Sequence, residues 1–352
     1  MLPATETLLA LPVLNEGVVT SVPVVVLNAH SRCNCRCVMC DIWKRDAASE
    51  VTAADLERHR ESFRRLGVRW VVLSGGEPLM HSSLSDLCTF FRESNIRLTL
   101  LTTGLLLERR SEEVAKFFDD VIVSLDGPAE VHDAIRRTPG GFAMIRRGIA
   151  RLRERREDMV ISARTTVQKG NHLCLTDTVE AALSIGLSGI SFLAVDLTSE
   201  AFNRPLLWPV ERQNSIALTE SEVSSLSNEI GRLIVARREQ ILSGYIAENA
   251  AKLRRIVSHF RAHLGLEAAR APECNAPWVS AVIESDGTVR PCFFHQPIGN
   301  IHDGSLEDAV NGDMALSFRR SLDIPKNPIC QRCVCSLHYE SGKPLPERLH
   351  RS

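Results

Sequence analysis

Strand-like and helix-like segments alternate through the first half of the chain, and this alternation limits its possible folds more than any other feature. Between about Val24 and Val195, six short apolar runs typical of buried strands, among them Val160 to Val167, are separated by segments whose apolar residues recur at helical spacing. Thr52 is expected to cap the first of these helices. Such repeats predict a parallel sheet with right-handed crossovers. Because six units are too few to close an eight-stranded barrel, the expected fold is α/β, a partial (β/α)6 TIM-like barrel.

The remaining sequence predicts two further regions after the barrel. Helical patterns cover Glu220 to Gln240 and Glu248 to Leu264, with Thr219 and Glu222 as a capping box. From Pro272 the sequence becomes irregular, and Asp286-Gly287 signals a hairpin. The predicted organisation is an N-terminal extension over 1–22, a barrel core over 23–197, a connecting helical segment over 198–268 and a small α+β domain over 269–345.

Composition excludes several classes of protein. The 42 basic and 43 acidic residues nearly cancel, so no global field points to nucleic acid, and the arginines of 146–156 fit the solvated face of a helix. No apolar stretch is long enough to cross a membrane, and the first 22 residues lack the basic start of a signal peptide. Eleven cysteines in a large chain without an export signal favour metal binding over disulfides. Cys88 lies on a helical apolar stripe and is expected in the core.

The first cysteine group follows the first strand directly. The segment from Cys33 to Cys40 offers thiolates with spacers of three and two residues at Cys33, Cys37 and Cys40. Because a four-iron cube usually takes four thiolates, three ligands leave one iron open to a small bidentate ligand, such as the amino acid group of S-adenosylmethionine (SAM). The alternative is a zinc site built from Cys35, Cys37 and Cys40.

Polar and glycine residues cluster where the next strands end. Gly75, Gly76, Glu77 and Pro78 follow the second strand, Ser124 and Asp126 end the fourth, and Arg164 lies inside the fifth. This edge of a parallel sheet is where ligands bind. The alternatives are an ordinary turn for Gly75-Gly76, a turn aspartate for Asp126, and an internal carboxylate partner for Arg164, which needs a partner if buried.

A second cysteine group occupies the C-terminal region. Cys274 and Cys292 flank the predicted hairpin, and Cys330 and Cys333 form a pair with two spacer residues. Four such thiolates can hold either a zinc ion or a four-iron cluster. Cys335 is left over, and it could replace Cys333.

Together these motifs resemble the radical SAM superfamily. The resemblance implies a [4Fe-4S] cluster on Cys33, Cys37 and Cys40 that binds SAM, with Cys35 a spare cysteine and Met39 in place of the usual aromatic residue. It also implies that Gly75, Gly76, Glu77 and Pro78 bind the SAM amino group, that Ser124 contacts the ribose, and that Asp126 and Arg164 contact cofactor or substrate. Thr103 stands where many relatives have Asn, and no role is assigned to it.

The resemblance extends to the later motifs. His132, Asp133, Ile135 and Arg136, followed by Gly140-Gly141-Phe142, resemble a stretch of relatives that carry extra clusters. The C-terminal cysteines resemble a twitch or shortened SPASM domain, which implies one auxiliary [4Fe-4S] cluster on Cys274, Cys292, Cys330 and Cys333. Four protein thiolates leave that cluster without an open iron, so electron transfer is its expected role, with a purely structural role as the alternative.

The implied reaction is reductive cleavage of SAM to a 5′-deoxyadenosyl radical that abstracts hydrogen from a substrate. The expected enzyme is an oxidoreductase acting on a small polar metabolite, because only about 23 residues precede the first strand and a peptide leader-binding domain would not fit there. The alternatives are a peptide-modifying enzyme that crosslinks or epimerises residues, and a non-catalytic iron–sulfur protein. Flavodoxin or ferredoxin is the expected reductant. The expected location is the cytoplasm, with neither nucleic acid nor membrane as a partner.

Overall fold

One continuous sheet of nine strands organises the described part of the chain. The computed structural model describes residues 13–14, 17–45, 47–202 and 207–340. The strand order is β11-β10-β9-β3-β4-β5-β6-β7-β8, and each neighbouring pair from β9 to β8 is parallel. The six predicted strands are β3 (Val24–His30), β4 (Trp70–Gly75), β5 (Arg97–Thr102), β6 (Asp120–Ser124), β7 (Val160–Val167) and β8 (Gly189–Ala194). The partial six-stranded barrel predicted from the sequence is therefore confirmed.

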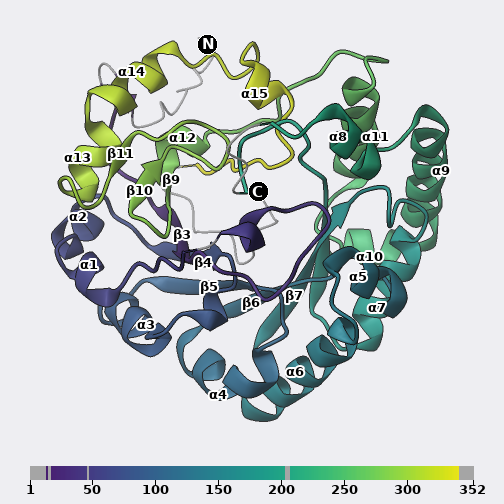
Figure 1. Ribbon diagram of the computed structural model, residues 1–352, viewed down its shortest axis with the longest axis horizontal. Helices are drawn as coiled ribbons and strands as arrows, with labels where there is room; N and C mark the ends of the chain where they lie inside the picture. The colour runs from purple at the N-terminus through teal and green to yellow at the C-terminus, as the bar shows by residue number, and fades with distance from the viewer. Residues whose placement is uncertain (1–12, 15–16, 46, 203–206, 341–352) are drawn as a thin grey trace, which may run out of the picture.

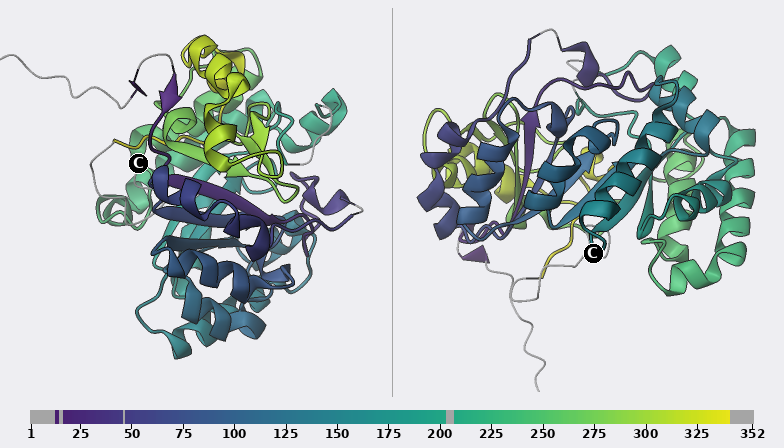
Figure 2. Two further views of the ribbon diagram at one scale, coloured as in Figure 1. Left: turned by 90° about the vertical axis from the view of Figure 1, so that its left-hand side faces the viewer. Right: turned by 90° about the horizontal axis from the view of Figure 1, so that it is seen from below.

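Amphipathic helices cover the outer face of this sheet, as Figures 1 and 2 show. Each buries its apolar stripe against the strands; in α3 that stripe includes Cys88, which is completely buried as predicted. The structure adds a helix between β6 and α6 that the sequence did not predict. The helices of this half are α1 (Ala53–Glu57), α2 (Arg60–Arg65), α3 (Leu84–Glu93), α4 (Leu107–Phe117), α5 (Ala129–Arg136), α6 (Gly141–Arg155) and α7 (Leu175–Ser184).

The helix expected to begin at Thr52 is interrupted. Thr52 caps α1 with a capping box, but the chain leaves helical geometry at His59 before α2 begins. The His59 side chain is buried, and its Nδ1 accepts a hydrogen bond from the backbone N–H of Leu306, at the start of α13 (3.2 Å). This contact between distant parts of the chain accounts for the break, and no local pattern could have predicted it.

The segment after β8 extends the outer layer of helices. It contains α8 (Val210–Ile216), α9 (Glu220–Ala236), α10 (Arg238–Leu242) and α11 (Ala250–His263). Thr219 forms the predicted capping box with Glu222. Helix α9 packs against α7 and α11, and α11 contacts β8, so the predicted connecting segment is part of the same layered structure.

The C-terminal region joins the barrel through its sheet. Strand β9 (Ser280–Ile283) pairs with β3 in parallel, and β10 (Thr288–Arg290) and β11 (Gly299–Asn300) continue antiparallel. Gly287 has a φ of +83° in the hairpin turn predicted at Asp286-Gly287. Figures 1 and 2 show this green-to-yellow segment beside the purple strand β3. The region also contains α12 (Ala276–Val279), α13 (Leu306–Asn311), α14 (Asp313–Ser321) and α15 (Pro328–Gln331).

Part of the predicted domain organisation lies outside the described residues. The expected extension over 1–22 falls largely outside them, and so does the end of the expected domain over 269–345.

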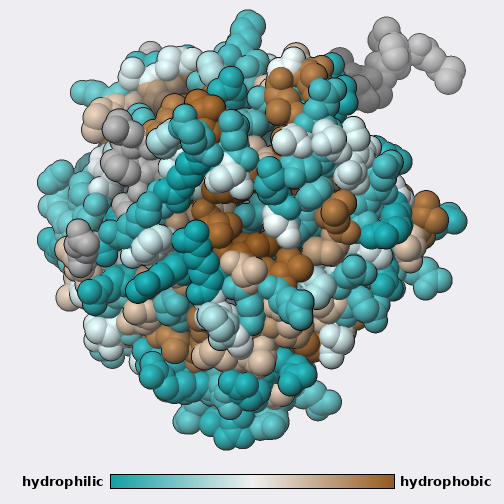
Figure 3. Space-filling model, turned by 45° about the vertical axis from the view of Figure 1, so that its right-hand side comes forward, coloured by the Kyte–Doolittle hydropathy of each residue, from teal (hydrophilic) through white to brown (hydrophobic). Residues whose placement is uncertain are grey.

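Among the described helices, none has both the length and the apolar character needed to span a bilayer. On the face shown in Figure 3, hydrophobic residues gather in a central hollow and the surroundings are mostly hydrophilic.

Candidate functional site

The segment carrying Cys33, Cys37 and Cys40 leaves β3 and is held against the end of α5. The backbone N–H of Arg36 donates to the Arg136 carbonyl (3.3 Å), and that of Val38 donates to the Ile135 carbonyl (3.0 Å). These two carbonyls belong to the last turn of α5, where no intrahelical donor reaches them. The helix end and the cysteine segment therefore satisfy each other's backbone hydrogen-bonding groups, and these contacts fix the conformation of the segment.

Three thiols of this segment lie together. Cys35 is 2% exposed and Cys37 is 6% exposed, so both thiols are buried. The Cys33 thiol, together with burial, raises the pKa of Cys35 to about 11, and the Cys35 thiol together with burial raises the pKa of Cys37. Cys40 accepts a hydrogen bond from the backbone N–H of Ile42 at its sulfur (3.4 Å). The structure thus places the extra cysteine, Cys35, among the predicted ligands.

These residues suit thiolate ligation of an iron–sulfur cluster. Every cysteine of the chain is a free thiol, and Arg136 Nη1 lies 3.6 Å from the Cys37 sulfur, where it can donate to a thiolate. Within the described ranges, no three Cys, His, Asp or Glu side chains are close enough to hold a single metal ion.

Gly75 and Gly76 bring the end of β4 into direct contact with the cysteine segment. The Gly76 N–H donates to the His30 carbonyl, and the Glu77 N–H donates to the Arg32 carbonyl (both 2.8 Å). A side chain at Gly76 would place Cβ 1.9 Å from the Arg32 carbonyl oxygen, and Gly75 has a φ of +118°. Both positions therefore require glycine, for a close backbone approach that an ordinary turn would not need.

The Glu77 carboxylate lies inside the protein. It is completely buried and accepts hydrogen bonds from the Thr102 hydroxyl (2.7 Å), from the Thr103 hydroxyl and N–H (both 2.7 Å), and from the Leu79 N–H (3.0 Å). The side chain thereby ties the end of β4 to the end of β5. Binding of the SAM amino group, which the resemblance implies for this motif, stays a prediction.

Thr103, to which the sequence assigned no role, belongs to this network. Its hydroxyl also lies 2.9 Å from the Asn34 side-chain amide in the cysteine segment. A hydroxyl has one proton, so the Thr103 hydroxyl donates to one of two acceptor oxygens at a time, Glu77 Oε2 or Asn34 Oδ1. Thr103 therefore connects the buried carboxylate with the cysteine segment. The only sequence signal was a hydroxyl residue at a strand end, where many relatives have Asn.

Ser124 and Asp126 follow the end of β6, where Ser124 pairs with Arg164 of β7. Asp126 is completely buried, and its carboxylate binds Arg136 Nε (2.6 Å) and the Thr166 N–H (2.9 Å). The side chain therefore has internal partners, and its predicted contact with cofactor or substrate stays a prediction. Arg136, which the sequence singled out only as part of a motif, is the residue that connects Asp126 to Cys37.

Arg164 faces a different group of residues. It lines a cavity of about 710 Å³, together with Glu248 and Cys335. Burial lowers the pKa of Arg164, and the negative charges of Cys335 and Glu248 partly offset this effect. Burial raises the pKa of Glu248 to about 7, and the Glu248 carboxylate accepts a hydrogen bond from the Phe192 N–H (2.9 Å). Both candidate partners of Arg164, an internal carboxylate and the SAM carboxylate, stay predictions.

The second cysteine group lines the same cavity. All five of its members contribute to the wall, namely Cys274, Cys292, Cys330, Cys333 and Cys335. Two of these sulfurs have a nitrogen within hydrogen-bonding distance. His295 Nε2 lies 3.3 Å from Cys330 Sγ, and the Ala276 N–H donates to Cys274 Sγ (3.5 Å). Four of these thiols can hold the predicted auxiliary cluster, and both Cys333 and Cys335 remain candidates for the fourth position.

Comparison with known protein families agrees with this geometry. Residues 27–181 match the radical SAM superfamily, and residues 274–334 match the iron–sulfur cluster-binding SPASM domain. The chain belongs to the radical SAM superfamily and carries a SPASM-type auxiliary cluster domain. Its cofactors are SAM, a [4Fe-4S] cluster that binds it and an auxiliary iron–sulfur cluster.

Curated relatives match parts of their own length. Fe-coproporphyrin III synthase of Methanosarcina barkeri is 33% identical over 42% of this chain and 38% of its own. AdoMet-dependent heme synthase of the same organism is 32% identical over 44% of this chain and 45% of its own. The subtilosin biosynthesis protein AlbA of Bacillus subtilis is 23% identical over 80% of this chain and 58% of its own. The chain thus spans less than half the length of the first two relatives.

Solved structures share the fold. Streptococcus suis SuiB bound to its precursor peptide SuiA aligns with a TM-score of 0.62 and 16% identity, over 92% of this chain and 73% of that one. Native anSMEcpe with bound AdoMet aligns with a TM-score of 0.62 and 19% identity, over 88% of this chain and 86% of that one. At these identities the structures support the architecture and leave the substrate undecided.

Proposed function

We propose that this chain is a hydrogen-abstracting radical SAM enzyme in which Cys33, Cys37 and Cys40 hold the cluster that binds SAM. One observation carries the proposal: the cysteine segment is fixed between the end of α5 and the close glycine approach of β4. The bound cofactors supply reductive cleavage of SAM and the resulting carbon radical. The protein positions SAM beside the strand ends at Gly75 to Pro78 and Ser124.

The cavity beside Arg164 is the proposed place of the substrate and the auxiliary cluster. Its volume falls within the usual range for small-molecule sites. Its lining includes the apolar side chains of Val24, Val26 and Trp70. It also includes three basic residues and three acidic ones, namely Arg164, Lys252, Arg255, Glu248, Glu273 and Glu340. This lining favours a substrate with an apolar body and charged groups over the small, wholly polar metabolite expected from the sequence.

Oxidation of a small molecule is the function we favour. The auxiliary cysteines line the cavity in which the substrate would lie, so an electron from a substrate radical would have a nearby acceptor. The relatives named as synthases of heme and Fe-coproporphyrin III agree with a small molecule that combines apolar and anionic parts. Peptide modification is the second candidate, because the match to the subtilosin biosynthesis protein covers 80% of the chain.

SAM cleavage tests the central proposal. Anaerobically reconstituted protein, given SAM and dithionite, is expected to release 5′-deoxyadenosine slowly without substrate. Porphyrin-type carboxylic acids and short peptides are then compared, each deuterated at carbon, and the active class is identified by deuterium transfer into 5′-deoxyadenosine. Reconstituted protein that contains iron and sulfide but releases no 5′-deoxyadenosine would refute enzymatic function and leave the non-catalytic alternative.

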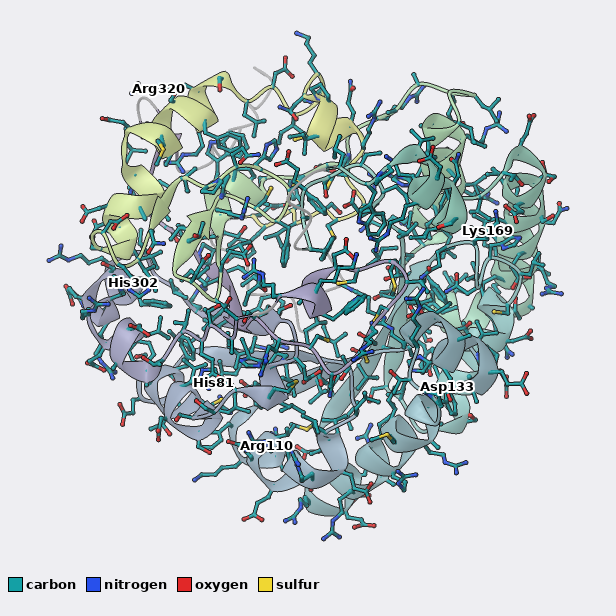
Figure 4. All side chains as sticks on the ribbon, viewed as in Figure 1. His81, Arg110, Asp133, Lys169, His302 and Arg320 are labelled. Atoms are coloured by element: carbon teal, nitrogen blue, oxygen red, sulfur yellow. The ribbon has the colours of Figure 1, made fainter. Side chains whose placement is uncertain are left out.

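A surface groove of about 870 Å³ is the proposed docking site of the reductant. Cys37 lines it, together with an apolar wall from Val38 and Trp43 and the basic residues Lys44, Arg137, Lys169 and Arg212. Lys169 and Asp133, labelled in Figure 4, mark the side of the molecule on which the groove lies. A groove that combines a cluster cysteine with a basic rim suits an acidic electron carrier such as flavodoxin or ferredoxin.

Neutralising the rim tests this docking site. Arg137→Gln combined with Lys169→Gln is expected to lower flavodoxin-supported SAM cleavage several-fold, because opposite charges accelerate association. Dithionite-supported cleavage is expected to stay unchanged, since dithionite needs no docking surface. Arg109→Gln, an exposed position on α4, is the matched control and should leave both rates unchanged. Equal flavodoxin-supported rates in the double variant and the wild type would place the reductant elsewhere.

A further inference from the structure

A buried ion pair lies directly behind the cysteine segment. Arg136 Nε binds the Asp126 carboxylate at 2.6 Å, and Arg136 Nη1 reaches the Cys37 sulfur at 3.6 Å. The Asp126 side chain is fully buried and that of Arg136 is 11% exposed. One guanidinium therefore bridges a carboxylate and a predicted cluster ligand in a region almost closed to water. An arginine in this setting stays charged.

The surrounding structure fixes this pair from several sides. His132 and Arg136 lie four residues apart on one face of α5, and both contact Asp126. The backbone N–H of Asp126 donates to His132 Nδ1 (3.2 Å), and the Asp126 carbonyl accepts from Asn171 Nδ2 (2.9 Å). The second carboxylate oxygen accepts from the Thr166 N–H. Asp126 is thus an anchor whose position does not depend on Arg136 alone.

The same helix end also holds the backbone around Cys37. The carbonyls of Ile135 and Arg136 accept from the cysteine segment on both sides of Cys37, and the Thr138 hydroxyl lies 3.7 Å from the Cys35 sulfur. Asp133 closes the next turn by accepting from the N–H groups of Gly140 (2.6 Å) and Phe142 (2.8 Å). The conspicuous motif from His132 to Phe142 therefore forms one support for the segment.

We propose that Arg136 is a positioning residue that donates a hydrogen bond to the Cys37 thiolate and, with Asp126, sets the reduction potential of the SAM-binding cluster. The inference rests on the proposed function, because it requires Cys37 to be a ligand. Reduction adds one negative charge to the cluster. A fixed cation beside a ligand sulfur stabilises the reduced state and raises the potential, and the neighbouring carboxylate opposes this effect.

Two substitutions, each removing one charge of the pair, are expected to shift the midpoint potential of the cluster in opposite directions. Arg136→Gln removes the cation and is expected to lower the midpoint potential. Asp126→Asn removes the anion but keeps an amide oxygen that can accept from Arg136 Nε, and is expected to raise it. The double variant is expected to return toward the wild-type value, because both charges are gone. The measurement is an anaerobic potentiometric titration of the full chain that follows the electron paramagnetic resonance signal altered by SAM.

Arg146→Gln provides the matched control. Arg146 lies on α6 and is exposed, so water screens its charge, and its removal should leave the potential unchanged. A purely structural role for the pair would lower iron content without opposite shifts in potential. Unchanged potentials in both single variants, or shifts of the same sign, would overturn the inference while leaving SAM cleavage intact. A chain that binds no iron would instead refute the proposed function itself.

Discussion

The triple variant Cys33→Ala, Cys37→Ala, Cys40→Ala is expected to retain about half of the wild-type iron and to lose all SAM cleavage. Two four-iron clusters give about eight irons per chain, and the variant keeps only the auxiliary cluster. The cleavage is lost because no iron is left with an open position for SAM. Iron and sulfide analysis, together with 5′-deoxyadenosine release under dithionite, measures both effects.

Two further variants separate the cysteines by role. Cys330→Ala with Cys333→Ala is expected to remove the other half of the iron and to leave cleavage of SAM without substrate in place. Cys35→Ala tests the register, because the buried Cys35 thiol interacts with the thiols of Cys33 and Cys37. Full iron content and cleavage in this variant support Cys33, Cys37 and Cys40 as ligands. Loss of the cluster would make Cys35 a ligand, and zinc in place of iron would contradict the whole scheme.

The barrel could be predicted because its signals are local. Each strand is a short apolar run, and each long helix carries an apolar stripe, so β7 over Val160–Val167 agrees with prediction at both ends. Helix α5 was missed, because its eight residues contain only two fully buried side chains, His132 and Ile135. The break at His59 was missed because its cause is a hydrogen bond to a residue 247 positions away.

The candidate site, like the fold, was only partly predictable from the sequence. Spacing drew attention to both groups of cysteines, and the resemblance to the radical SAM superfamily implied which of them are ligands. The functions of Glu77, Asp126 and Arg164 were harder to predict, because a buried charge is defined by partners from other strands. Asp126 binds Arg136, and Arg164 lies near Glu248, which begins the segment leading into α11. Thr103 gains its role only through Glu77 and Asn34.

Glu77→Ala is expected to lower the free energy of unfolding of the apoprotein by about 3–5 kcal/mol. The substitution leaves the Thr102 and Thr103 hydroxyls and two backbone N–H groups buried without their acceptor, and each such group carries a desolvation penalty. Because the same network reaches Asn34, the cysteine segment loses support, and reconstituted iron should also decrease. Urea unfolding followed by circular dichroism under anaerobic conditions measures the stability.

Two comparisons make this prediction specific to the buried network. Glu61→Ala removes an exposed carboxylate from α2 and is expected to leave the stability nearly unchanged, since surface ion pairs contribute little. Thr103→Ser keeps the hydroxyl and should retain most of the stability, whereas Thr103→Val removes it and should cost about 1–3 kcal/mol. If Glu77→Ala unfolds at the same urea concentration as Glu61→Ala, the carboxylate does not hold β4 and β5 together, and Glu77 must instead be free to face a ligand.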